Sequence, residues 1–239
     1  MTNLLYHQDS YLKTFQAKVT AHDLENHAIL LNQTIFFPGG GGQPFDMGKI
    51  QVGDQVIPFK RSKNINGEVW HLVAEEFPLP SIGSEVSGEI DWEHRYQTMR
   101  THTAMHILCG VVFRDYGALV TGGDMEPLQG RMDFEFESMT LDLVKIIEGA
   151  VNKEVSAARE IRIAILEREE AFKIPDLIRT KVNLLPPGIQ QIRTVEIVGL
   201  DLQADGGTHV HNTNEVGTLR ITDYKSKGKI NKRIYLQLS

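Results

Sequence analysis

The chain has 239 residues, a length that corresponds to one or two domains. Hydrophobic residues make up 41% and charged residues 23%, which is typical of globular proteins and excludes disordered, collagen-like and coiled-coil chains. The 25 basic and 31 acidic residues give a net charge of −6, which argues against a protein that coats nucleic acid nonspecifically.

The first 90 residues or so have the pattern of short β-strands separated by polar turns. Asn66-Gly67 is a hairpin signal. Several short strands at this spacing predict a small β-barrel, and we expect residues 1–91 to form this barrel domain, with a boundary near Asp91. Three apolar stretches read as strands: Phe15–Val19, Ala28–Leu31 and Ile35–Phe37.

From residue 92 onward the pattern is mixed. Helices are predicted over 92–115 and 140–159, with a short helix over 167–173. Helices and strands do not alternate regularly, so an α+β domain over residues 92–239 fits better than a doubly wound sheet. The predicted strands are 161–166, 191–198, 215–223 and 229–238.

Two histidines lie four residues apart in the first predicted helix. His102 and His106 therefore share one helix face, within reach of one metal ion, although two surface histidines also occur at this spacing by chance. Thr103 stands where a zinc protease of the H-E-x-x-H type has its glutamate, so a protease is disfavoured. Cys109 is either a further ligand on this face or a small buried apolar residue.

A second cluster contains Asp205, Gly206, Gly207 and His209. The two glycines allow a turn that brings Asp205 and His209 together, where they can complete a tetrahedral site begun by the helical histidines. Alternatively, Asp205 caps its own backbone in a polar turn. If this segment is extended, His211 shares a face with His209.

Four consecutive glycines, Gly39, Gly40, Gly41 and Gly42, follow an apolar stretch and precede Gln43. Glycine loses the most conformational entropy on folding, so such a run needs a reason. One use is to bring backbone N–H groups close to a phosphate, ribose or carboxyl group; a flexible linker is the alternative. No P-loop lysine follows, so binding of a nucleoside triphosphate is unsupported.

Taken together, these three features resemble the editing domain of alanyl-tRNA synthetase, and the glycine-rich stretch resembles the free-standing AlaX family. The resemblance covers nearly the whole chain. It implies an α+β protein with an N-terminal small β-barrel followed by an α+β zinc-binding editing domain. It also implies hydrolysis of the ester between a wrong amino acid and tRNA(Ala), with serine as the family's usual target and glycine as a further candidate.

The resemblance implies one zinc ion, held by His102, His106 and His209. Asp205 stands where the family pattern C-G-G-T-H has its cysteine. A carboxylate oxygen can bind zinc at about 2.0–2.2 Å, although a harder ligand is expected to retain zinc less well than a thiolate. Alternatively, the three histidines hold the metal and water takes the fourth place. Loss of metal and activity is a third outcome.

The resemblance also implies roles for the remaining candidates. Backbone amides of residues 39–42 are expected to bind the terminal adenosine or the developing oxyanion, and Asp46 is expected to bind substrate. Gln43 is expected to orient water or substrate, and Thr34 to bind the serine hydroxyl. A site that hydrogen-bonds this hydroxyl can reject the analogue lacking it by about 10⁴. Gln203 either lines the pocket or has a structural role.

The expected partner is tRNA(Ala) charged with serine or glycine, contacted through the basic runs at 60–63 and 225–233. No apolar run approaches the ~20 residues that span a bilayer, and the N-terminus lacks signal-peptide features. We therefore expect a cytoplasmic protein, monomer or dimer, without a membrane partner. The competing hypotheses are a zinc hydrolase of another ester or amide, and a noncatalytic tRNA- or metal-binding module derived from an editing domain.

Overall fold

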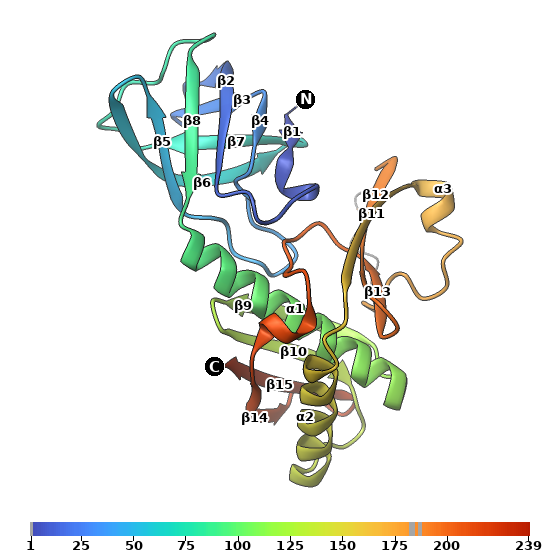
Figure 1. Cartoon of the computed structure of the whole chain (residues 1–239). Helices are drawn as coiled ribbons and strands as arrows, with labels where there is room; N and C mark the ends of the chain where they lie inside the picture. Colours follow the sequence, from blue (N-terminus) through green and yellow to red (C-terminus); the bar gives the residue numbers. More distant parts are fainter. Residues whose placement is uncertain (1, 182–184, 186–187) are drawn as a thin grey trace. The chain divides into compact units, whose positions relative to one another are not determined.

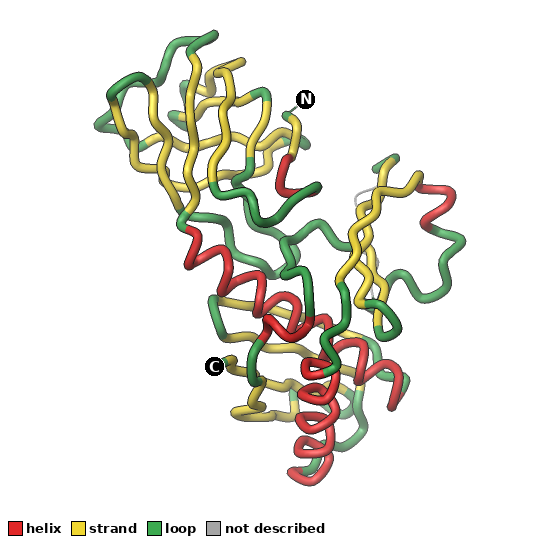
Figure 2. Tube along the Cα trace, viewed as in Figure 1, coloured by secondary structure: helices red, strands yellow, loops and turns green. Residues whose placement is uncertain are grey.

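The computed structural model describes residues 2–181, 185 and 188–239, and the chain divides into two compact units (Figures 1 and 2). These units are Met1–Gln97 and Thr98–Ser239. The division falls inside helix α1 (Trp92–Tyr116), whereas the sequence placed it near Asp91. The first turns of α1 belong to the first unit because Trp92 packs against its apolar core. The mixed α and β content predicted from the sequence is confirmed.

Six strands of the first unit pair in a closed ring, in the order β2-β3-β7-β6-β5-β8, and every pair is antiparallel. Alternate side chains of β2 and β8 are buried, so each strand directs one face into a common apolar core. The short strands β1 (Asn3–Leu4) and β4 (Gln33–Thr34) pair separately, and the 3₁₀ turn η1 (Leu5–His7) lies between them in the chain. The strands of the ring are β2 (Thr14–Asp23), β3 (Ala28–Leu31), β5 (Gly48–Val52), β6 (Gln55–Ile65), β7 (Glu68–Val73) and β8 (Glu85–Ile90).

The predicted hairpin at Asn66-Gly67 is confirmed, since it joins β6 to β7. Its φ angles of 54° and 85° suit a turn that requires the left-handed region at both positions. The strand predicted over Ile35–Phe37 is wrong. These residues have no ladder partner, because side chains satisfy the backbone: Phe36 N–H donates to Thr34 Oγ1 at 3.1 Å, and Phe37 N–H donates to Asp46 Oδ2 at 2.6 Å.

In the second unit, α1 packs on a four-stranded antiparallel sheet of order β14-β15-β10-β9. Close packing depends on glycines of this sheet: a Cβ at Gly130 would lie 3.0 Å from Met105 Sδ, and one at Gly123 would lie 3.2 Å from Met105 Cε. Helix α2 (Leu141–Ser156) is attached to β14 through Asn152, whose side chain bonds both backbone groups of Leu219. The strands are β9 (Val120–Glu126), β10 (Gln129–Glu135), β14 (Leu219–Ser226) and β15 (Asn231–Leu238).

A second sheet of this unit has the order β11-β12-β13 and is antiparallel throughout (Figure 1). It is built from β11 (Ile161–Glu167), β12 (Gln191–Ile197) and β13 (Asp201–Ala204), with the short helix α3 (Arg168–Ala171) after β11. Strands β9 and β13 were not predicted as elements. No helix in the described part of the chain is both long enough and apolar enough to cross a membrane.

The strand predicted over 215–223 begins late. Residues Thr213–Val216 form the 3₁₀ helix η2 instead, because Asn212 and Glu215 make a reciprocal capping box: the Asn212 side chain accepts from a backbone N–H of the helix, and the Glu215 side chain accepts from the N–H of Asn212. The ladder of β14 starts only at Leu219.

Candidate metal site and its surroundings

Helix α1 supplies the first half of the candidate site. No glycine or proline interrupts it before Gly110, so the spacing of four residues puts His102 and His106 on one face. Both side chains are largely buried, and their ring centres lie 5.0 Å apart. The predicted arrangement of this pair is therefore found in the second unit.

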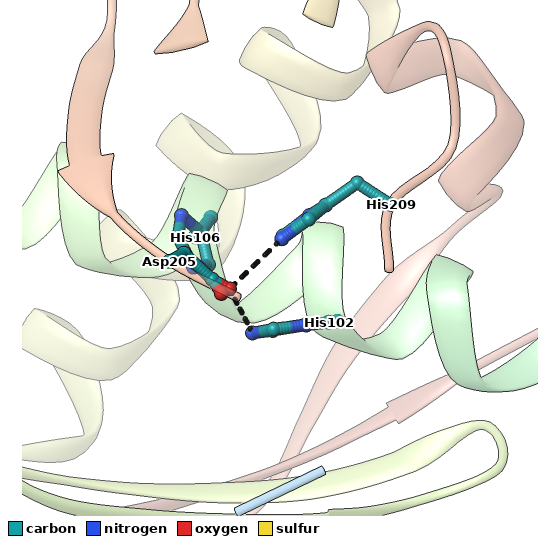
Figure 3. A group of neighbouring side chains, drawn as sticks. All are labelled: His102, His106, Asp205 and His209. Atoms are coloured by element: carbon teal, nitrogen blue, oxygen red, sulfur yellow. Dashed lines mark hydrogen bonds and ion pairs between the residues drawn. The ribbon is translucent and has the colours of Figure 1, made fainter. Parts of the chain in front are cut away.

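The second half comes from the loop after β13. Asp205 is followed by two glycines, and the Gly207 N–H donates to both carboxylate oxygens of Asp205, at 3.1 and 3.0 Å. This turn folds the chain back so that His209, which is 1% exposed, faces the same carboxylate. The two interpretations of Asp205 thus hold together: it caps its own turn and it faces the histidines. Figure 3 shows the four side chains converging.

The geometry fits one tetrahedral metal ion. One ligand atom from each of His102, His106, Asp205 and His209 lies within 4.8 Å of all the others. Ligands of a tetrahedral zinc ion at about 2.0–2.2 Å stand about 3.3–3.6 Å apart. Asp205 Oδ1 lies 3.5 Å from His102 Nε2 and 3.4 Å from His209 Nε2. Three imidazoles and one carboxylate are a donor set that zinc accepts.

The protonation states of His102, His209 and Asp205 suit metal binding, whereas His106 is an exception. Burial lowers the pKa of His102 well below its usual value and lowers that of His209 to about 4. Both rings are therefore neutral at pH 7 and keep a nitrogen lone pair. Burial alone would raise the pKa of Asp205, but the neighbouring histidines hold it well below its usual range. At His106 burial is outweighed by the hydrogen bond to Asp201 and by the charge of Asp205, which raise the pKa.

Arg193 of β12 bonds both backbone groups of Asp205. Its backbone oxygen accepts from the Asp205 N–H at 3.0 Å, and its Nη1 donates to the Asp205 carbonyl at 2.9 Å. The arginine is only 6% exposed, and besides burial its charge contributes to the lowered pKa of His102 and His209. A permanent cation thus lies close to the cluster and favours unprotonated histidines.

Thr103 lies beside His102 in sequence but serves His209. Its Oγ1 lies 3.1 Å from His209 Nδ1 and accepts the Val210 N–H at 3.3 Å. Since Nδ1 of His209 is engaged in this way, its Nε2 is the nitrogen that faces Asp205. The residue that argued against a protease thus orients one of the candidate ligands.

The glycine-rich run lies in the first unit and forms a tight turn. Gly40 and Gln43 exchange both backbone hydrogen bonds at 3.0 Å, so Gly41 and Gly42 are the central residues of a two-residue turn. Their φ angles, 61° and 89°, lie in the left-handed region where only glycine is free of strain. The run is therefore an ordered turn and not a flexible linker. The N–H of Gly40 is already used within it.

Thr34 is fully buried in the first unit. Its Oγ1 lies 2.9 Å from Nε2 of His71, which is also fully buried, and accepts the N–H of Phe36. Burial lowers the pKa of His71 to about 4, so the ring is neutral. Gln43 is buried as well, at 3% exposure. The hydrogen bonds to His71 and to the Phe36 N–H thus fix the direction of the Thr34 hydroxyl.

Asp46 is engaged in an ion pair that the sequence did not reveal. Arg95, which has no exposed surface, donates Nε to Asp46 Oδ1 at 2.7 Å and Nη2 to Oδ2. The same guanidinium donates to the backbone oxygens of Ser10 and Ile35, at 2.8 and 2.6 Å. With the Phe37 N–H on Oδ2, the carboxylate of Asp46 is occupied by protein donors.

Comparison with known proteins assigns the family. The family described as "Threonyl and Alanyl tRNA synthetase second additional domain" matches residues 192–235, and the family described as "tRNA synthetases class II (A)" matches residues 7–94. The alanyl-tRNA editing protein AlaX-M of Saccharolobus solfataricus is 39% identical over 98% of both chains. The chain belongs to the AlaX-M family of alanyl-tRNA editing proteins.

Further relatives agree with this assignment. AlaX-M of Methanosarcina mazei is 33% identical over all of this chain and 97% of the relative. The alanine–tRNA ligase of Ignicoccus hospitalis is 35% identical over 92% of this chain, but the match covers only 24% of the ligase. This chain therefore corresponds to a part of the longer ligase.

Two other candidates, His211 and Cys109, are not members of the cluster of His102, His106, Asp205 and His209. His211 is exposed and is not a member of the cluster. Cys109 is buried and is not a member either; burial raises the pKa of its thiol, so it stays protonated. Gln203 lies next to the cluster, where its Nε2 donates to Asp201 Oδ2 at 2.6 Å and lies 3.5 Å from His106 Nδ1.

The basic run at residues 225–233 is partly neutralised by acidic partners. Lys232 is buried and donates Nζ to the carbonyls of Gly228 and Lys229, which stabilises the β14–β15 turn. Arg233 pairs with Asp133 through two bonds of 2.6 and 2.8 Å, and Lys225 pairs with Asp223 at 3.0 Å. The run presents less free positive charge than its sequence indicates.

Proposed function

We propose that this protein is a trans-editing hydrolase that removes serine, and also glycine, from wrongly charged tRNA(Ala). The observation that carries the proposal is the largely buried cluster of His102, His106, Asp205 and His209, in which Asp205 Oδ1 lies at the separation of tetrahedral ligands from the Nε2 atoms of His102 and His209. The relatives named alanyl-tRNA editing proteins, matched over nearly the full chain, support the same conclusion about substrate class.

One zinc ion is the proposed cofactor, with Asp205 as its fourth ligand in place of the family's cysteine. Because four side chains would hold it, a bound zinc ion would act as a Lewis acid for the ester carbonyl, or lower the pKa of a water molecule to about 7, only by accepting a fifth ligand. The residues of the chain prepare this site in advance. His102 and His209 stay neutral through burial, and the Gly207 N–H fixes the direction of the Asp205 carboxylate.

We assign substrate recognition to the first unit. The backbone amides of Gly39, Gly41 and Gly42 and the side chain of Gln43 are proposed to bind the terminal adenosine, the developing oxyanion or the attacking water, whereas the N–H of Gly40 is held within the turn. The turn at Gly41 and Gly42 supports this role because a rigid turn holds its N–H groups in place before substrate arrives. Asp46 contributes by holding the adjoining backbone at Phe37.

Thr34 is the proposed contact for the serine hydroxyl. Its hydroxyl oxygen has two lone pairs, and one accepts the N–H of Phe36. Because Thr34 is buried, a serine hydroxyl reaches it only after the covering residues move. Alanine and glycine lack the hydroxyl and gain no bond to Thr34, whose Oγ1 already bonds His71, so this contact favours hydrolysis of the seryl ester over both.

The test is deacylation of seryl-, glycyl- and alanyl-tRNA(Ala) by the zinc-loaded protein. We expect loss of serine and glycine while alanine is retained, and loss of this activity in His102→Ala. His211→Ala is the matched control, because His211 is exposed and outside the cluster. A zinc-loaded protein that leaves all three esters intact would refute the proposal and favour a noncatalytic tRNA- or metal-binding module.

A further inference from the structure

We infer that Asp201 is a positioning residue that fixes His106 for metal binding, and that Gln203 acts through Asp201 and not on the substrate. The inference rests on the metal site of the proposed function. Asp201 and Gln203 contact His106 or each other, and neither is assigned a direct part in the hydrolysis.

The contacts of the Asp201 carboxylate carry the inference. The side chain has no exposed surface, and Oδ2 lies 3.5 Å from His106 Nδ1. Gln203 Nε2 donates to the same oxygen at 2.6 Å, and Arg179 Nε donates to Oδ1 at 3.3 Å. A buried carboxylate needs such partners, and here one of them is a candidate metal ligand.

These contacts determine which nitrogen of His106 faces the metal site. A neutral imidazole has one N–H, and a carboxylate accepts but cannot donate. The proton therefore lies on Nδ1, toward Asp201, which leaves the Nε2 lone pair free to bind metal. Gln203 Nε2 lies 3.5 Å from the same Nδ1, and because both are donors they meet at the carboxylate rather than with each other.

The backbone is shaped to bring Asp201 to this place. Gly110 lies one helical turn after His106, on the same face of α1. A Cβ at Gly110 would lie 3.0 Å from the Asp201 Cβ and 2.9 Å from Leu200 Cγ. Only glycine therefore lets the turn between β12 and β13 approach α1 this closely. Arg179, the other partner of Asp201, stacks on Phe113, with its Cζ 3.9 Å from the centre of the ring.

The first measurement is zinc affinity, determined by competition with a chromophoric chelator in the absence of tRNA. We expect Asp201→Asn to weaken zinc binding about 10- to 100-fold, the usual effect of losing such a partner. Asp133→Asn is the matched control, because Asp133 is also buried and also paired with an arginine, but on the β10–β15 sheet. This variant is expected to bind zinc as the parent does.

A double-mutant cycle separates positioning from general loss of structure. If Asp201 acts through His106, Asp201→Asn has no further effect on zinc affinity once His106→Ala is present. The visible spectrum of the cobalt-substituted protein is expected to change in Asp201→Asn and to stay unchanged in Asp133→Asn. Equal effects of Asp201→Asn with and without His106 would overturn the inference.

The outcomes also distinguish this inference from the proposed function. An Asp201→Asn variant with the zinc affinity of the parent overturns the inference alone, and leaves the hydrolase proposal standing. Strong coupling in a protein that deacylates none of the tRNAs upholds the inference and refutes the hydrolase. A parent protein that binds no zinc overturns both the inference and the metal site.

Discussion

Replacing Asp46 by Asn is expected to destabilise the first unit by about 3–5 kcal/mol, the usual cost of removing one partner of a buried ion pair. Both oxygens of Asp46 accept from Arg95, whose guanidinium is fully buried. Asparagine keeps the shape of the side chain but leaves the arginine charge without compensation. It also weakens the bond from the Phe37 N–H, which holds the chain just before the glycine-rich turn.

Tryptophan fluorescence during heating is the assay. The chain has two tryptophans, Trp70 and Trp92, and both lie in the first unit. In a unit that ends at Gln97, a loss of this size lowers the unfolding midpoint by about 12–20 °C. The control is Glu89→Gln, which removes an ion pair with Lys49 whose side chains are 52% and 53% exposed. An exposed pair of this kind contributes at most about 1 kcal/mol.

An Asp46→Asn protein whose midpoint stays as close to the parent's as that of Glu89→Gln would refute this reasoning. It would mean that the arginine charge finds other compensation, and would leave the carboxylate free for a role in substrate binding. If the reasoning is correct, adding Arg95→Met to Asp46→Asn recovers part of the loss, because the stranded charge is removed.

Three further predictions concern the cluster and the buried histidine of the first unit. Asp205→Cys is expected to raise zinc affinity in chelator competition, since a thiolate is the softer ligand; unchanged affinity would show that Asp205 does not bind the metal. Zinc at about 100 times its dissociation constant should stabilise the parent by about 2.7 kcal/mol in thermal unfolding, and His209→Ala much less; equal stabilisation would exclude His209. Burial lowers the pKa of His71 from 6.5 to about 4 in the folded chain, so between these pH values the unfolded chain binds a proton at His71 more readily than the folded chain does. Stability from neutral His71 is therefore complete above pH 6.5 and is lost as the pH falls to 4, by about 3 kcal/mol. In urea unfolding at both pH values, His71→Gln should lack this loss; the same pH dependence in parent and variant would contradict it.

Features that depend on near neighbours in the chain could be predicted from the sequence. His102 and His106 share a face because helical spacing alone brings residues i and i+4 together. Asn66-Gly67 gives a hairpin because its backbone preferences match the turn. The Asp205 turn follows from two adjacent glycines. The family resemblance predicted that this turn and the helical histidines form one metal site. These signals were enough to name the four cluster residues.

The residues that support the site could not be recognised in this way. Arg193, Asp201 and Arg95 look like ordinary polar residues in the sequence, and only the folded chain shows that each is buried and bonded. Ile35–Phe37 reads as a strand, but a bond from the Phe37 N–H to the Asp46 side chain and one from Arg95 to the Ile35 carbonyl take the place of a ladder. Local preference determines helices and tight turns; burial and charge compensation depend on segments far apart in the chain, so only the tertiary structure decided which polar groups hold the site.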